Sequence, residues 1–267
     1  MFRTFETSEP RFEHEGLRLV TVKSGALRGR ADLSLWVPPA EVNPAGVVIL
    51  LHGVYGSHWG WSLRGGAHRT AARLVAEGSL PPFVLAMPSD GLWGDGSGYL
   101  RHATQDFERW IVEDVPAAVR QAVPALAAKA PLFLAGLSMG GFGALRLGAK
   151  YGDRFRAVCG HSSITEFGQL AQFVEEPLGT YGCAPEDASV LETVRARRGA
   201  LPALRFDCGT EDPLIEPNRV LHRELQSLGV PHEYEEHPGG HEWPYWERHL
   251  ADTLRFFGRC AAGSAGR

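Results

Sequence analysis

One serine of this chain stands in a setting that can turn a weak nucleophile into a strong one. Residues 136–140, Gly-Leu-Ser-Met-Gly, have the form G-x-S-x-G and join a short apolar run to an amphipathic run. A serine hydroxyl attacks a carbonyl only when it is exposed, rigidly held and beside a base, and a tight strand-to-helix turn provides the exposure and the rigidity. The motif alone is weak evidence in a chain with 32 glycines, but its place between a strand pattern and a helix pattern predicts that Ser138 is a nucleophile.

The residues that would activate such a serine follow later in the chain. His241 lies after the last strand pattern, where two glycines allow a close loop before the final helical stretch. An acid must orient this histidine and stabilise its charged form, and Asp212 stands just beyond a strand pattern. Glu211 is the alternative acid, whereas Asp207 lies inside the strand and is expected to be structural. The chain order Ser138, Asp212, His241 is the order found in α/β-hydrolases.

Two backbone N–H groups are candidates to hold the negative charge that develops on an attacked carbonyl oxygen. One belongs to Met139, directly after the serine. The other belongs to Val54, in the loop that follows the apolar run GVVILL. The alternative interpretation of His52 and Gly53, which precede Val54, is an ordinary turn at the end of a strand. We predict an oxyanion hole formed by the N–H groups of Val54 and Met139.

Aromatic side chains are candidates to line a substrate pocket beside these groups. Two loops, residues 55–61 and 89–102, leave the carboxyl ends of predicted strands, where ligands of open α/β sheets bind. Packing in the core is the alternative for each aromatic residue, and Trp243 and Trp246 are expected to brace the loop of His241. The predicted pocket residues are Tyr55, Trp59, Trp61, Trp93, Tyr99 and His161.

The chemistry of these residues requires no metal and no organic cofactor, and we predict neither. His237 and His241 are four residues apart, but Pro238 and two glycines prevent the helix that would place both on one face. The four cysteines show no C-x-x-C spacing and do not suggest a disulfide framework.

Composition and charge limit the kinds of partner. The formal net charge of −4, from 27 basic and 31 acidic residues, comes without a block of like charges, which argues against nucleic acid and anionic membranes as partners. The apolar runs are far shorter than the roughly 20 residues that cross a bilayer, and the amino terminus does not resemble a secretory signal. We therefore expect a cytoplasmic protein that acts on a small molecule. The sequence is compatible with a homo-oligomer.

The elements that must position these residues alternate along the chain. Short apolar runs are separated by segments whose apolar residues recur every three or four positions, which predicts a doubly wound, mostly parallel sheet. Before them, residues 17–24 and 31–39 have alternating apolar positions and predict an antiparallel hairpin at the sheet edge. The predicted parallel strands lie within residues 46–53, 82–89, 130–136, 155–160 and 204–209.

A single domain accounts for all 267 residues. Residues 165–201 interrupt the alternation, and we expect them to form a cap-like insertion over the carboxyl edge of the sheet, where insertions often wall a pocket. Residues 259–267 are expected to be a flexible tail.

Four segments, taken together and in order, resemble the putative-esterase branch of the α/β-hydrolases. They are LLHGVYGSHWGW, GLSMGGFGAL, CGTEDPLI and PGGHEWPYW, and the resemblance runs from about residue 17 to residue 257. That branch holds esterase D and S-formylglutathione hydrolase, antigen 85 mycolyltransferases, tributyrin esterases, and feruloyl and acetylxylan esterases. The resemblance implies an α/β-hydrolase fold with Ser138 as nucleophile, Asp212 as acid and His241 as base. It also implies oxyanion donors at Val54 and Met139.

The resemblance also favours some of the possible activities over others. S-formylglutathione hydrolases usually carry a histidine before the serine and another in the following helix, whereas this chain has Leu137 and Phe142 there. The chain is therefore more similar to the tributyrin and carbohydrate esterases. We predict a serine carboxylesterase that hydrolyses short acyl or aryl esters of sugars or other small alcohols through an acyl-enzyme. The alternatives are an S-formylglutathione-type thioesterase, an acyltransferase with the same triad, and a catalytically silent binding protein.

Overall fold

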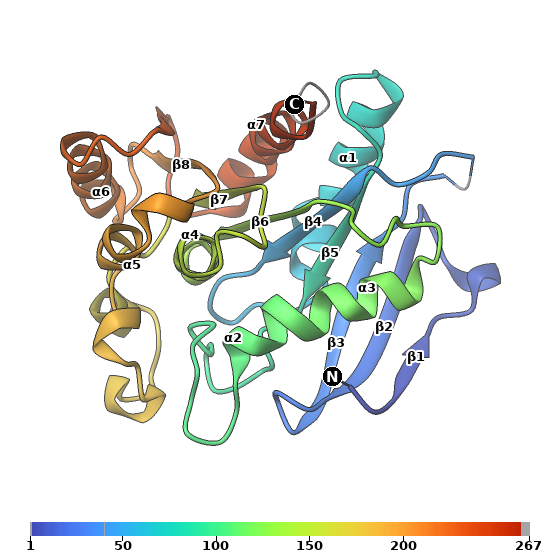
Figure 1. Ribbon diagram of the computed structural model, residues 1–267, viewed down its shortest axis with the longest axis horizontal. Coiled ribbons are helices and arrows are strands. Elements are labelled where there is room, and N and C mark those ends of the chain that lie inside the picture. Colours follow the sequence, from blue (N-terminus) through green and yellow to red (C-terminus); the bar gives the residue numbers. More distant parts are fainter. Residues whose placement is uncertain (1, 40, 263–267) are drawn as a thin grey trace.

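The computed structural model describes residues 2–39 and 41–262, which form an α/β fold around one nine-stranded sheet (Figure 1). The strands lie in the order β1-β2-β3-β5-β4-β6-β7-β8-β9. Their bounds are β1 Phe5–Thr7, β2 Leu17–Ser24, β3 Gly29–Trp36, β4 Gly46–Leu51, β5 Phe83–Pro88, β6 Leu132–Leu137, β7 Ala157–His161, β8 Ala203–Gly209 and β9 His232–His237.

The direction of the strands follows the expected division of the sheet. Strands β5, β4, β6, β7, β8 and β9 run parallel, while β1, β2 and β3 pair antiparallel and β3 joins the parallel part by an antiparallel pairing with β5. The predicted amino-terminal hairpin is therefore confirmed. The short strand β1, which the sequence analysis did not identify, pairs with β2 and forms the outer edge beyond this hairpin.

Helices cover both faces of the sheet (Figure 1). Residues of α3, α4 and α6 belong to the apolar core on one face, and residues of α1 and α7 belong to the core on the other. Every residue of β4 and β5 is buried, as expected for parallel strands between two helical layers. The helix bounds are α1 Ala67–Ala76, α2 Phe107–Arg109, α3 Val115–Ala122, α4 Met139–Lys150, α5 Val190–Ala196, α6 Ile215–Ser227 and α7 Trp243–Ala262.

The segment of residues 165–201 leaves the sheet after β7 and returns at β8, and it contains α5 and several 3-10 turns. A buried ion-pair network joins it to α4. Arg146 is completely buried and donates to Glu108 at 2.8 Å and to Asp187 at 2.9 Å, so each buried charge has a partner. Because Asp187 belongs to this segment, the network holds the segment against the helix that follows Ser138.

The carboxyl-terminal helix extends further than the sequence analysis expects. Residues 259–262, predicted to belong to a flexible tail, form the last turn of α7, because Cys260 and Ala261 pack on the core and Arg259 pairs with Glu233. Residues 263–267, the rest of that predicted tail, lie outside the described residues. None of the helices in the described part of the chain is both long and apolar enough to span a membrane.

Candidate active site

Ser138 lies at the tip of the turn between β6 and α4. Its backbone has φ +56° and ψ −119°, and its N–H donates to the carbonyl oxygen of His161 at 2.9 Å. The flanking glycines are needed for this turn, because a Cβ atom on Gly136 would lie 2.1 Å from the carbonyl oxygen of Gly140. A Cβ atom on Gly140 would lie 2.4 Å from the carbonyl oxygen of Leu51. The sequence therefore folds here into a tight elbow that presents the serine at the carboxyl edge of the sheet.

The structure brings Ser138, His241 and Asp212 together from three separate loops. His241 Nε2 lies 3.0 Å from Ser138 Oγ, and His241 Nδ1 lies 2.9 Å from Asp212 Oδ2. Asp212 is almost completely buried, while the side chain of His241 is 19% exposed. A carboxylate can only accept, so Nδ1 carries the proton and Nε2 is free to accept the proton of the serine hydroxyl.

The surroundings of Asp212 favour its charged form. Burial acts to raise the pKa of Asp212, but the hydrogen bond and the charge of His241, together with the N–H of Leu214 at 2.8 Å, hold this pKa below its usual value. Asp212 is therefore ionised at neutral pH and can stabilise an imidazolium on His241. Glu211, the alternative acid, instead accepts a hydrogen bond from the N–H of Gly239 and braces the loop that carries His241.

Two backbone N–H groups face the serine without a partner in the protein. Among the described residues, neither the N–H of Val54 nor that of Met139 donates to another residue. Met139 is the first residue of α4, where the helix dipole is positive, and Val54 lines the same pocket as Ser138. A Cβ atom on Gly53 would come within 3.2 Å of Ser138 Cβ, which shows how closely the Val54 loop passes the serine.

The loop that carries Val54 is held by the buried side chain of His52. His52 Nδ1 donates to the carbonyl oxygen of Gly53 at 2.7 Å, and His52 Nε2 accepts the N–H of Asp90 at 3.0 Å. The carbonyl oxygen of His52 accepts the hydroxyl of Tyr99 at 3.0 Å. These contacts brace the loop, and a preorganised oxyanion hole requires such support.

Ser138 lines a pocket of about 500 Å³. Tyr55 and Trp59, both predicted from the sequence, line this pocket and keep 68% and 44% of their surface exposed. A larger hollow of about 990 Å³ lies at the other end of the strands, near Leu132 and Ala203, far from any of the predicted catalytic residues. The pocket at Ser138 is therefore the candidate active site.

The chain matches a known protein family, described as putative esterase, over residues 24–257. This chain belongs to the putative-esterase family. The matched range contains Ser138, Asp212 and His241 together with their loops, and the protein is a carboxylic ester hydrolase.

Individual relatives of the esterase support the same fold. An acetyl esterase of Caldicellulosiruptor saccharolyticus is 26% identical over 229 residues, which cover 79% of this chain and 82% of the relative. Among solved structures, a ferulic acid esterase is 24% identical with a TM-score of 0.79, covering 98% of this chain and 100% of that chain. The fluorophosphonate-binding serine hydrolase F of Staphylococcus aureus is 20% identical with a TM-score of 0.76, covering 95% and 97%. The expected α/β-hydrolase fold is thus confirmed.

Four predicted pocket residues of the esterase do not line the pocket. Trp61 is 1% exposed and donates from Nε1 to the carbonyl oxygen of Leu51 at 3.0 Å. Trp93 packs edge-on against Tyr181, with ring centroids 4.8 Å apart, and Tyr99 is buried beneath the Val54 loop. Trp61 and Tyr99 are buried in the core, where their apolar surface is removed from water, and Trp93 is half-buried against it.

His161, the fourth of these residues, belongs to a buried polar network on the α7 side of the sheet. Its Nδ1 lies 3.0 Å from Asp207 Oδ1, and its Nε2 lies 3.0 Å from Thr253 Oγ1. Asp207, interpreted from the sequence as structural, also accepts the hydroxyl of Tyr245 at 3.0 Å. His161 therefore fixes β7 beside Ser138 with its side chain directed away from the substrate.

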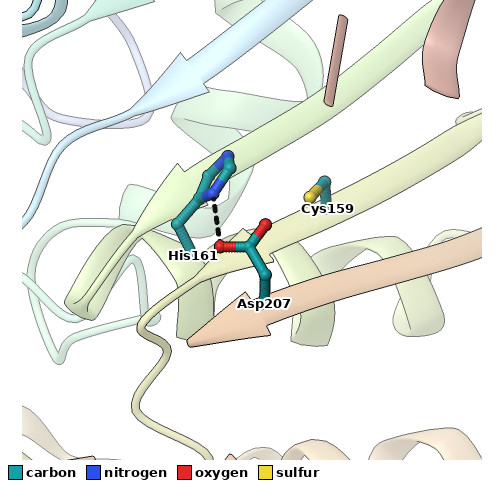
Figure 2. A group of neighbouring side chains, drawn as sticks. All are labelled: Cys159, His161 and Asp207. Carbon is teal, nitrogen blue, oxygen red and sulfur yellow. Dashed lines mark hydrogen bonds and ion pairs between the residues drawn. The ribbon is translucent and has the colours of Figure 1, made fainter. Parts of the chain in front are cut away.

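Three groups of this network, Cys159, His161 and Asp207, lie close enough together to raise the question of a metal ion (Figure 2). All three are completely buried, and the guanidinium of Arg205 contacts both the thiol and the carboxylate. Burial raises the pKa of Cys159 to about 11, so the sulfur is a neutral thiol. Because a thiolate is the form that binds a metal and Arg205 already neutralises the carboxylate, these residues do not fit a metal site.

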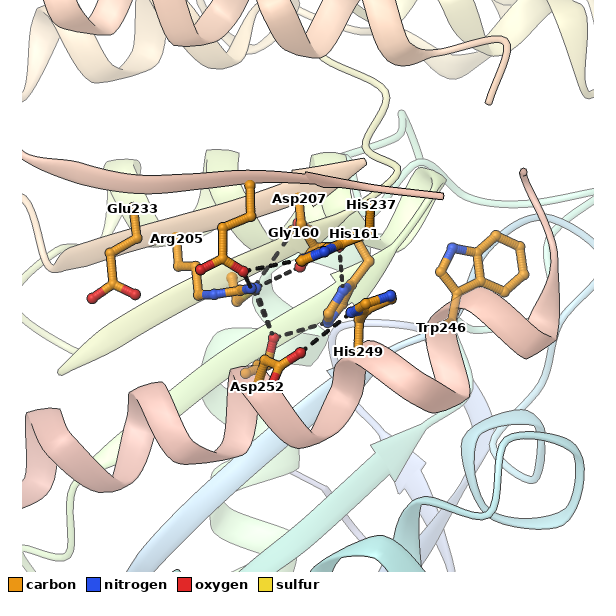
Figure 3. A network of polar contacts seen from close by, with 12 residues as sticks. Gly160, His161, Arg205, Asp207, Glu233, His237, Trp246, His249 and Asp252 are labelled. Atoms are coloured by element: carbon orange, nitrogen blue, oxygen red, sulfur yellow. Dashed lines mark hydrogen bonds and ion pairs between the residues drawn. The ribbon is translucent and has the colours of Figure 1, made fainter. Parts of the chain in front are cut away.

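A second group, His237, His249 and Asp252, lies between β9 and α7 (Figure 3). The two imidazole rings are stacked with centroids 4.1 Å apart and planes inclined by only 10°. The ring nitrogens lie beside carboxylates, His237 Nε2 at 3.1 Å from Glu235 and His249 Nδ1 at 3.2 Å from Asp252. Lone pairs in two parallel ring planes do not converge on one ion, so this group also lacks the arrangement of a metal centre.

The structure adds pocket residues that the sequence analysis missed. Phe173, from the segment of residues 165–201, stacks on His241, and Trp243, at the start of α7, forms part of the wall. Arg64 and Glu242 line the pocket with opposite charges. Phe173 stands in a segment without a strand or helix pattern, so no periodic signal marks it as a neighbour of the base.

Proposed function

We propose that this esterase is a serine carboxylesterase that hydrolyses short-chain acyl or aryl esters, including esters of sugars and other small alcohols, through an acyl-enzyme on Ser138. The observation that carries the proposal is the contact of 3.0 Å between His241 Nε2 and Ser138 Oγ, with Asp212 on the other imidazole nitrogen. Nucleophile, base and acid thus form one hydrogen-bonded chain at the floor of the pocket.

The first half of the reaction acylates the serine. As Ser138 Oγ attacks the ester carbonyl, its proton passes to His241 Nε2, and Asp212 stabilises the imidazolium. The negative charge on the carbonyl oxygen is held by the N–H groups of Val54 and Met139. When the tetrahedral intermediate collapses, the bond to the alcohol breaks and His241 returns the proton to the leaving oxygen. In the second half, water takes the place of the alcohol and releases the acid and the free serine.

The size and the lining of the pocket suit a small substrate. Its volume of about 500 Å³ lies in the range of small-molecule sites, and aromatic side chains form much of its wall. The names of two similar proteins, an acetyl esterase and a ferulic acid esterase, describe esters of a short acyl group and of an aromatic acid. Both kinds of acyl group suit an aromatic-walled pocket of this size.

The test compares wild type with Ser138→Ala on p-nitrophenyl esters of increasing acyl length, with the intact mass measured during turnover. We expect the substitution to lower kcat by about 10⁴-fold to 10⁶-fold and to remove the acyl adduct. The rate of wild type should fall at the acyl length that fills the pocket. An inactive wild type without an adduct, or a Ser138→Ala variant that keeps its rate, would refute the proposal in favour of a binding protein.

Two further substrates separate the remaining alternatives. If an added alcohol such as glycerol becomes acylated faster than water releases the acid, the enzyme is an acyltransferase. If S-formylglutathione is hydrolysed with a higher kcat/KM than every oxygen ester in the series, the enzyme is a thioesterase. Both results would keep Ser138 as the nucleophile and change only the acceptor or the leaving group.

A further inference from the structure

Arg64 lines the pocket of Ser138 from the end of a firmly held turn. It is the last residue of the π-helical turn Gly60–Arg64, and the indole N–H of Trp61 in this turn donates to the carbonyl oxygen of Leu51 at 3.0 Å. The N–H of Gly65, directly after the turn, donates back to the carbonyl oxygen of its first residue at 3.1 Å. The backbone at Arg64 is therefore fixed, although the side chain is exposed.

The guanidinium of Arg64 lies over the ring of Trp243, with 5.6 Å between its central carbon and the ring centroid. Attraction to the face of a ring holds a cation in place but uses none of its N–H groups as hydrogen-bond donors to oxygen. Among the described residues, the side chain of Arg64 has no hydrogen bond and no ion pair. Its N–H donors, which lie in one plane, are therefore free for an acceptor on a bound molecule.

Trp243 is itself held in place by other aromatic rings. It meets Trp61 edge-on, with ring centroids 5.8 Å apart, and it meets Trp246 edge-on, with centroids 5.4 Å apart. Trp246 in turn meets the imidazole of His241, with centroids 5.1 Å apart. One chain of ring contacts therefore joins the ring under the guanidinium to the base of the triad.

The charges around the pocket are unevenly distributed. Arg64 is the one lysine or arginine among the described residues that line it. Near Tyr55 the charges are negative, because Asp95 accepts the hydroxyl of Tyr55 at 3.4 Å and the N–H of Glu175 at 2.7 Å. The carboxylate of Glu176 lies there too and accepts the N–H of Asp95 at 3.1 Å. An anionic group on a bound ester is repelled by these carboxylates and attracted by Arg64.

Glu242 is the charge of the pocket lining that opposes this attraction. Its position has a separate explanation, because it directly precedes α7 and a carboxylate at the start of a helix is favoured by the helix dipole. Within the described part of the chain, no ion pair joins it to Arg64 and no hydrogen bond holds its side chain. The positive charge of the pocket is thus held on a ring, whereas the negative charge of Glu242 is not.

We propose that Arg64, held over Trp243, forms an anion subsite of the active-site pocket, so that the esterase prefers esters that bear a carboxylate. A carboxylate suits this subsite because its two oxygens can accept two parallel N–H bonds from one guanidinium. The proposal rests on the proposed function of Ser138 and narrows its substrate class. The carboxylate can belong to the alcohol part or to the acyl part of the ester, and the experiment distinguishes the two.

Two pairs of esters measure the preference, and the members of each pair differ in one charge. In the first pair, 4-acetoxybenzoate and its methyl ester, the charge is on the leaving phenol. In the second pair, mono-4-nitrophenyl adipate and its methyl ester, the charge is on the acyl part. The readout is the ratio of kcat/KM for phenol release, anionic over neutral, in one enzyme preparation. The concentration of active sites cancels in this ratio, so a variant that folds poorly still gives a valid result.

Three variants and one matched control are compared with wild type. Arg64→Gln removes the charge, and Arg64→Lys keeps the charge without the planar fork of donors. Glu242→Gln removes the opposing charge. Arg248→Gln is the control, because Arg248 is an exposed arginine of α7 that does not line the pocket.

We expect Arg64→Gln to lower the ratio by about 3-fold to 10-fold for at least one pair of esters, and Arg64→Lys to lower it less. Glu242→Gln should raise the ratio. The ratio of wild type should fall from about 0.05 M to about 0.5 M NaCl, because salt screens the attraction, and that of Arg64→Gln should change less. A change confined to the first pair places the carboxylate on the alcohol part, and one confined to the second pair places it on the acyl part.

Two results would overturn the proposal. The first is an Arg64→Gln variant with the ratio of wild type for both pairs, because the guanidinium would then only pack on Trp243. The second is an equal fall of the ratio in Arg248→Gln, which would indicate an effect of net charge on the whole protein. A wild type that hydrolyses none of the four esters is a different result, since it refutes the proposed function of Ser138 itself.

Discussion

The imidazole of His241 is stacked on the phenyl ring of Phe173, with ring centroids 5.4 Å apart and planes inclined by 18°. Phe173 belongs to the segment of residues 165–201, which is more than 60 residues away from the histidine in the chain. The segment predicted to cover the carboxyl edge of the sheet thus supplies a wall against the candidate base. It does so without a hydrogen bond to the imidazole, so the contact can orient His241 without changing its partners.

Phe173→Ala should lower kcat/KM for p-nitrophenyl acetate by about 2-fold to 10-fold, the effect of one aromatic contact. The imidazole loses a flat neighbour and gains freedom to turn away from Ser138. Phe167→Ala is the matched control, because Phe167 lies in the same segment and packs on Tyr181 away from the pocket. The control should lower the melting temperature and leave kcat/KM of the folded enzyme unchanged; an equal activity loss in both variants would contradict a specific role for Phe173.

Trp59 and Trp93 offer a test of the pocket boundary. Trp59 lines the pocket and Trp93 packs behind it on Tyr181. Trp59→Ala should raise KM for aryl esters several-fold with little effect on acetyl esters, because only the larger acyl group reaches this wall. Trp93→Ala should lower the melting temperature and leave the ratio of aryl to acetyl kcat/KM unchanged. The pocket boundary is wrong if Trp93→Ala changes this ratio and Trp59→Ala does not.

Asp212 and Glu211 are neighbours of similar chemistry with different contacts. Asp212→Asn should lower kcat by about 10⁴-fold, because an amide can donate to His241 Nδ1 and so favours the wrong tautomer. Glu211→Gln should keep most of the activity, since Glu211 contacts the N–H of Gly239 and not the imidazole. Steady-state kinetics of the two purified variants decide which of the two carboxylates is the acid of the triad. A larger loss in Glu211→Gln would make Glu211 the acid.

Asp207 should make the stability of the esterase depend on pH. Burial opposes the charge of Asp207, but His161 and Arg205 hold its pKa below the ordinary value. This group therefore contributes stability that is fully present above the unfolded pKa of about 3.9 and is lost as the pH falls through the lower folded value. Asp207→Asn should cost about 3 kcal/mol of unfolding free energy at pH 7, because the buried guanidinium of Arg205 loses its buried carboxylate and keeps only the more exposed Glu235.

The difference between wild type and Asp207→Asn should shrink as the pH falls below about 4. Urea unfolding at pH 7, 5, 4 and 3 measures it. Asp153→Asn is the control, because Asp153 is exposed and makes no ion pair within the described part of the chain. A difference that stays constant across this pH range would mean that the charge of Asp207 does not stabilise the fold.

The sequence alone was sufficient for the order of the main elements, for the esterase family and for the candidate residues that the fold brings together. The turn at Ser138 is local: five consecutive residues determine it, and the glycines at 136 and 140 are required by backbone contacts that any such turn makes. The alternation of apolar runs and helical patterns places the loops of Asp212 and His241 at one edge, because all parallel strands end there. Candidate residues far apart in the chain could therefore be predicted to meet.

Only the tertiary structure decided which side chains reach the pocket. Tyr55, Tyr99 and Ser162 all have positive φ, which residues other than glycine adopt only rarely. The shared conformation does not decide where they point: Tyr55 lines the pocket, whereas Tyr99 and Ser162 are buried. No periodic pattern encodes such turns, because they depend on contacts with distant strands and helices. The contact of Phe173 with His241 has the same origin, whereas Asp212 was already favoured over Glu211 by the sequence and the structure places it against His241.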